Sequence, residues 1–130
     1  MNKLVLNAFI PGEPKTWERA QAFGARRFNS KKMKRAQANL AWSLRAAAPG
    51  IRVEEHARFG VQLEFYISKK GDGDNYEKLV LDALTGVVWE DDDQIFESQW
   101  KKISTVGFPG DFAKHLKPGI HLIVYRIEGL

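Results

Sequence analysis

Carboxylates with a chemically informative spacing occur in two places in this chain. Asp72 and Asp74 stand on either side of Gly73, and a run of aspartates at 91–93, called the acidic turn below, follows later. We expect Gly73 to let the backbone turn tightly, so that both neighbours point into one pocket. Oxygen ligands with no Cys in the chain and no His nearby favour Mg²⁺ or Mn²⁺ over Zn²⁺. Such a cation suits phosphoryl chemistry, because it polarises a phosphate oxygen and neutralises the leaving oxyanion.

A basic side chain lies within the first acidic segment. Asp74, Lys78 and Asp82 are spaced four residues apart and therefore share one face of a helix. Lys78 on that face would offset the negative charge of a pentacovalent transition state or position the nucleophile. If the strand ends converge there, carboxylates from both segments surround one cation, and a second metal ion is also possible.

Each of these groups also has a simpler explanation. Asp74 fits a helix N-cap, with Glu77 completing a capping box. Lys78 fits an ordinary ion pair along a helix, and the acidic turn fits a solvated loop. Asp72, between two glycines, has the weakest alternative of this kind. The predicted metal site therefore depends on the convergence of the groups and not on any one of them.

The elements that must position these residues follow from hydrophobic periodicity. The pattern predicts strands at 3–10, 58–68, 94–105 and 120–127, a helix from Ser30 to about Ala48, and a helix from Asp74 to Gly86. The strongest strand signal is the alternation of apolar residues between Phe59 and Ile67. The order strand–helix–strand–helix–strand–strand predicts an α/β (α+β) fold, with a mixed β-sheet packed against two main helices in a single domain, residues 1–130.

Composition excludes several classes of protein. The chain has 130 residues, 44% hydrophobic residues and no Cys, so it is not a disordered chain, a disulfide scaffold, a zinc finger or a thiol enzyme. Apolar runs are too short for a membrane span, and we expect a cytoplasmic protein with no membrane partner. The EF-hand pattern fails at Tyr76 and Ala83, and no dinucleotide or phosphate-loop motif is complete. His56, His115 and His121 are expected at surface or structural positions, and the Trp residues in the core, with Trp17 the exception.

The net charge of +4 hides a separation along the chain. Residues 15–35, the basic segment, carry eight basic residues against one acidic residue, whereas residues 72–97 carry nine acidic residues against one lysine. A basic protein indicates a polyanionic partner, and a metal ion reconciles that partner with the acidic cluster; two solvated surfaces that balance each other are the alternative. The candidate DNA-binding residues are Lys15, Arg19, Arg26, Arg27, Lys31, Lys32, Lys34, Arg35, Lys69 and Lys70.

Two segments together carry a family resemblance. Residues 72–84 (DGDNYEKLVLDAL) and 89–95 (WEDDDQI) resemble the signature of RusA-type Holliday junction resolvases, and the similarity extends more loosely over most of the chain. The resemblance implies a homodimeric endodeoxyribonuclease of recombination and repair, often prophage-encoded, that nicks four-way junction DNA symmetrically. It implies Mg²⁺ as the cofactor, with Mn²⁺ as a substitute. It assigns metal binding to Asp72, Asp74 and Asp92, and an essential basic role to Lys78.

Some assignments stay open within the resemblance. Placing Trp89 and Gln94 in register selects Asp92 as the third ligand, with Asp91 and Asp93 as alternatives. Asp82 matches the motif as a supporting or structural carboxylate. A less selective metal-dependent DNA nuclease is one alternative function. A non-catalytic DNA-binding protein with a structural acidic cluster is the other.

Overall fold

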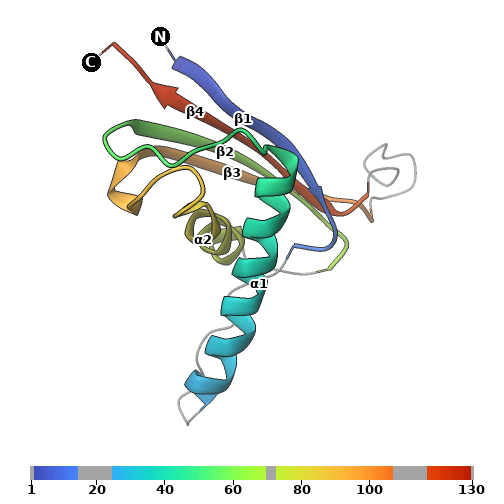
Figure 1. The fold of residues 1–130 in the computed structure, drawn as a ribbon. Coiled ribbons are helices and arrows are strands. Elements are labelled where there is room, and N and C mark those ends of the chain that lie inside the picture. Colours follow the sequence, from blue (N-terminus) through green and yellow to red (C-terminus); the bar gives the residue numbers. More distant parts are fainter. Residues whose placement is uncertain (1, 15–24, 70–72, 107–116, 130) are drawn as a thin grey trace.

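The computed structural model describes residues 2–14, 25–69, 73–106 and 117–129, and only the backbone for 25–33 (Figure 1). The elements in chain order are β1 (Asn2–Pro11), α1 (Ala25–Ala47), β2 (Arg58–Ile67), α2 (Gly73–Leu84), the 3₁₀ turn η1 (Asp92–Gln94), β3 (Ile95–Ser104) and β4 (Gly119–Ile127). This order confirms the predicted α+β class.

The strands form one mixed sheet in the order β1-β4-β2-β3. β4 runs antiparallel to both β1 and β2, whereas β2 and β3 are parallel neighbours. Parallel neighbours need a crossover connection, and α2 supplies it. Figure 1 shows α1 and α2 on the same side of the sheet. The crossover from β2 to β3 contains first α2 and then the acidic turn. Both candidate acidic segments therefore belong to the connection between two neighbouring strands.

The core lies between the sheet and the two helices. The alternation predicted in β2 is confirmed, because Phe59, Val61, Leu63 and Phe65 are all buried. The facing positions are supplied by buried apolar residues of β4, α1 and α2: Ile120, Leu122, Val124, Leu40, Leu44, Tyr76, Val80, Ala83 and Leu84. Burial of these side chains is the dominant favourable contribution to folding, and it fixes which face of α2 remains for the candidate site.

The helix α1 begins earlier than the sequence predicts. Ser30 is an interior residue of the helix and not its N-cap, since α1 starts at Ala25. Alanine and arginine at 25–27 are strong helix formers, so nothing local ends the helix at Ser30. The C-terminal half of α1 packs beside α2, while the N-terminal half projects beyond the sheet (Figure 1).

The tryptophans separate into different environments. Trp89 is fully buried in the core, as predicted. Trp100 is partly buried and packs against the core. The prediction is wrong for Trp42, whose relative exposure is 74%. Trp42 lies between the buried residues Leu40 and Leu44 in sequence, and two residues from each rotates it to the opposite face of α1. Trp17 lies outside the described residues.

Candidate active site

The first acidic segment lies at the start of α2. Asp74 is exposed in the first turn of the helix, which begins at Gly73, so Asp74 is not the N-cap. The predicted capping box is therefore wrong as well, because Asp74 lies inside the helix. The Glu77 carboxylate accepts a hydrogen bond from Ser98 Oγ of β3 at 2.7 Å. A carboxylate in this first turn is stabilised by the helix dipole. Asp72 lies outside the described residues.

Gly73 is required by packing. A Cβ atom at this position would lie 2.2 Å from Cζ3 of the Trp100 ring. The backbone at Gly73 is helical and its φ is not positive, so packing and not a left-handed conformation requires glycine here. The absence of a side chain lets the start of α2, and with it Asp74, approach β3 closely. The prediction that Asp72 and Asp74 point into one pocket involves Asp72, which lies outside the described residues.

Lys78 and Asp82 lie further along α2. Lys78 is exposed and Asp82 is partly buried. Burial raises the pKa of Asp82, while the positive charge of Lys78 and a hydrogen bond from Gln37 oppose that rise. The hydrogen bond runs from Gln37 Nε2 of α1 to Asp82 Oδ2 at 3.2 Å. Asp82 therefore links α2 to α1 through Gln37, and the positive charge of Lys78 acts on its carboxylate.

The acidic turn is a defined structure and not an irregular loop. Asp91 caps η1, and its carboxylate accepts a hydrogen bond from the backbone N–H of Asp93 at 3.1 Å. The side chain of Gln94 accepts from the backbone N–H groups of Glu90 and Asp91. Asp91, Asp92 and Asp93 are all exposed. Three carboxylates thus reach the surface from a backbone that hydrogen bonds hold in place.

Charge interactions connect the acidic turn to α2. A hydrogen bond with Asp91, together with the charge of Asp91, raises the pKa of Asp92, and the charges of Asp82 and Asp93 add to this effect. The pKa of Asp91 is lowered, first by the backbone N–H of Asp93 and then by the Asp92 side chain. Asp92 of η1 and Asp82 of α2 therefore lie close enough to influence each other.

The donor set suits a hard cation, although its assembly is incomplete in the described part of the chain. The hydrogen bond with Asp91, followed by the negative charge of Asp91, raises the pKa of Asp92, and a bound divalent cation would favour the ionised form of both carboxylates. Within residues 2–14, 25–69, 73–106 and 117–129, no three acidic or histidine side chains are grouped closely enough to hold a metal ion. Asp72, the remaining predicted ligand, is outside these ranges.

The candidate DNA-binding residues are only partly described. Lys34 and Arg35 are exposed on α1, and Lys69 is exposed just after β2. Arg26, Arg27, Lys31 and Lys32 belong to α1 but their side chains are not described, and Lys15, Arg19 and Lys70 lie outside the described residues. The chain just before the basic segment is fixed near the site, because the Glu13 carboxylate accepts from the backbone N–H of Ser68 at 3.1 Å.

Two features of the structure were not identified from the sequence. Gln94 is buried beneath the acidic turn, with a relative exposure of 7%.

His121 joins Asn7 of β1 to Glu64 of β2, with ring-nitrogen distances of 2.7 and 2.8 Å. Glu64 in turn pairs with Lys101 of β3 at 3.1 Å, so this row crosses all four strands. The row occupies the sheet face opposite the buried residues of β2, away from the candidate site.

The fold and the site together define a class of protein. It is a small α+β protein in which a crossover helix and the turn that follows it present carboxylates and a lysine, next to a long basic helix. The family model for endodeoxyribonuclease RusA matches residues 11–110, most of the chain, and the chain belongs to this family. The matched region contains both acidic segments, which confirms the predicted family. No curated protein matches the chain. Within the described residues, no helix is long and apolar enough to cross a membrane.

Proposed function

We propose that this chain is a Mg²⁺-dependent endodeoxyribonuclease that resolves four-way DNA junctions by paired, symmetric cleavage. The observation that carries the proposal is the family match over residues 11–110, which contains both acidic segments and Lys78. The influence of the Asp82 charge on the pKa of Asp92 supports it, because that influence requires the two acidic segments to lie near each other.

Each site residue has a proposed role. Asp72, Asp74 and Asp92 would hold the cation, with Asp91 and Asp93 as alternatives to Asp92 on the acidic turn. Bound there, a hard dication supplies Lewis-acid activation of the scissile phosphate and of water. The exposed ammonium of Lys78 offsets charge that develops on the phosphate. Asp82, partly buried beside it, keeps that ammonium on the acidic face.

The proposed substrate contact is the basic segment together with Lys69 and Lys70. Exposed lysine and arginine side chains contact phosphates without reading the base sequence, which suits a substrate defined by its branching. A four-way junction has approximate two-fold symmetry, so a homodimer would present one site to each of two symmetry-related strands. We propose a homodimer for this reason. We also propose that it acts in the cytoplasm, because its proposed substrate is DNA.

The proposal is tested by cleavage of junction DNA, linear duplex and single strands, each with Mg²⁺ or with EDTA. We expect paired nicks in the junction alone, with Mg²⁺ or Mn²⁺ supporting cleavage and EDTA abolishing it. Equal cleavage of all three substrates would support a less selective nuclease instead. Junction binding without cleavage under any metal condition would identify a non-catalytic DNA-binding protein.

Reversing charge on the exposed part of the basic helix should weaken DNA binding through phosphate contacts. In the double variant Lys34→Glu with Arg35→Glu, we expect the slope of log K against log salt concentration to fall by about 2, since each lost phosphate contact contributes about 0.9. Filter binding at several salt concentrations measures the slope. The control is Lys3→Glu with Lys117→Glu, which changes net charge equally at exposed positions outside the basic segment. If the wild type, the double variant and the control have equal slopes, Lys34 and Arg35 of α1 do not contact DNA.

A further inference from the structure

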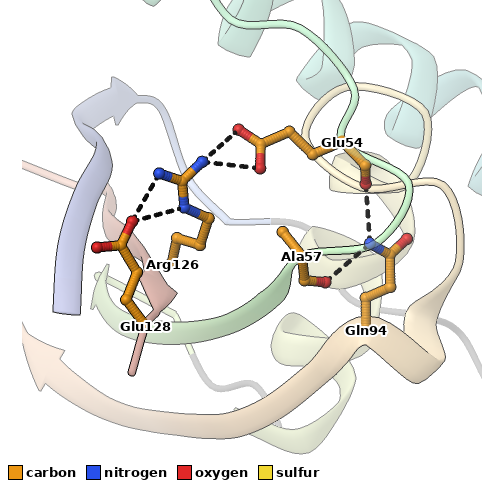
Figure 2. Close-up of polar contacts among 5 residues, drawn as sticks. All are labelled: Glu54, Ala57, Gln94, Arg126 and Glu128. Carbon is orange, nitrogen blue, oxygen red and sulfur yellow. Dashed lines mark hydrogen bonds and ion pairs between the residues drawn. The ribbon is translucent and has the colours of Figure 1, made fainter. Parts of the chain in front are cut away.

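Gln94 uses every hydrogen-bonding position of its side-chain amide. Its Oε1 accepts from the backbone N–H groups of Glu90 and Asp91 at 2.9 and 3.0 Å. Its Nε2 donates to the backbone carbonyls of Glu54 and Ala57 at 2.8 and 2.9 Å (Figure 2). An amide offers two acceptor and two donor positions, so this buried side chain is fully satisfied. Its orientation is fixed by its partners, since two N–H groups face one end and two carbonyls the other.

The segment that receives Gln94 is itself anchored to the sheet. Arg126 Nη1 of β4 contacts both carboxylate oxygens of Glu54 at 3.1 Å, and its Nη2 contacts Glu128 at 2.6 Å (Figure 2). The backbone N–H of Glu54 also donates to the carbonyl of Val88 at 3.0 Å. The acidic turn is therefore connected through Gln94 and residues 54–57 to a central strand of the sheet.

A turn that presents three carboxylates needs such support. Adjacent negative charges repel one another, and they favour any backbone rearrangement that separates them. The bonds from Gln94 are made by a neutral amide to backbone groups, so they hold the turn without adding charge or occupying the carboxylates. The neighbouring residue Trp89 is fully buried, which fixes the chain on the other side of the turn.

We infer that Gln94 is a positioning residue, which holds the backbone of the acidic turn so that the carboxylate proposed as a cation ligand, Asp92 or its alternatives Asp91 and Asp93, is presented in one fixed place. This inference rests on the proposed function. Gln94 touches neither cation nor DNA in this role; it acts through the backbone of the residues that do.

The experiment compares Gln94→Met, which keeps the volume of the side chain and removes all four hydrogen bonds, with the wild type. We expect amide hydrogen exchange at Glu90 and Asp91 to accelerate at least about 10-fold. We expect kcat for junction cleavage to fall about 10–100-fold, the usual effect of removing a group that orients metal ligands, with KM for DNA unchanged. The matched control is Gln99→Met, at an exposed position of β3, the strand that follows the turn, and it should change neither quantity.

A second variant keeps the inference testable if Gln94→Met fails to fold. Gln94→Glu retains both acceptor bonds but turns a carboxylate oxygen toward the carbonyls of Glu54 and Ala57 and adds a charge. Glu90 and Asp91 should then stay protected from exchange, while kcat falls because residues 54–57 no longer hold the turn. Unchanged amide exchange in Gln94→Met would overturn the inference. A second readout is the broadening of the amide NMR signals of residues 91–93 by added Mn²⁺. Faster exchange would also overturn the inference if both kcat and this broadening stayed at their wild-type values. If the wild type does not cut junctions, the proposed function fails by itself. Comparing the Mn²⁺ broadening of these amide signals in the wild type and in Gln94→Met then tests separately whether Gln94 positions the carboxylates.

Discussion

Replacing Asp74 by asparagine is expected to abolish junction cleavage while junction binding is retained. Asparagine has the shape of aspartate but lacks the charge that a hard cation requires. Asp74 is exposed in the first turn of α2, so the substitution removes little packing and the variant should fold. Loss of a direct ligand should exceed the effect of losing its supporting groups, so we expect kcat to fall by more than about 100-fold.

Single-turnover cleavage and gel-shift binding of the same junction DNA measure this prediction. Glu55→Gln is the matched control, because it neutralises an exposed carboxylate outside both acidic segments and should cut at the wild-type rate. Raising the Mn²⁺ concentration should restore part of the activity of Asp74→Asn if the defect is weaker metal binding. A variant that cuts as fast as the wild type would show that Asp74 is not a ligand.

The fold could be predicted because its strongest signals are periodic. Alternation from Phe59 to Phe65 predicts both the strand and its buried face, and both are observed. The stripe from Tyr76 to Leu84 predicts the buried face of α2 in the same way. Periodicity does not mark ends, however. The start of α1 was misplaced at Ser30 because a residue suited to capping is also tolerated inside a helix when its neighbours are strong helix formers.

The site could be predicted only in part, because local spacing carries no information on contacts between distant segments. The four-residue spacing of Lys78 and Asp82 predicts that they share a face of α2, and the charge of Lys78 does act on the Asp82 carboxylate. Gln94 was used only to align the motif, since its partners Glu54 and Ala57 are about forty residues away in sequence. One signal was available: the pair Asp91 and Gln94 has the spacing of a capping box, and the structure forms that box.

Gly73→Ala is the second substitution with a large expected effect, and two physical terms oppose each other there. Alanine at a helical position normally stabilises a protein by about 0.4–1 kcal/mol, because it restricts the unfolded chain. Here the new Cβ would lie 2.2 Å from the Trp100 ring, so either the ring or the start of α2 must move. Overpacking of this kind costs about 1–3 kcal/mol, which exceeds the gain. We therefore expect a lower midpoint of urea unfolding.

The larger consequence concerns cleavage, because Asp74 is the next residue along the chain. A displacement of about 1 Å at a reacting group can reduce the rate about 100-fold, and we expect a loss of that order in junction cleavage. Gly50→Ala is the control, since nothing lies within 4 Å of the added atom. Adding Trp100→Leu to Gly73→Ala removes the obstructing ring, so the double variant should cut faster than Gly73→Ala alone. Wild-type cleavage by Gly73→Ala would mean that Trp100 yields without moving α2, and that the approach of this helix to β3 does not position Asp74.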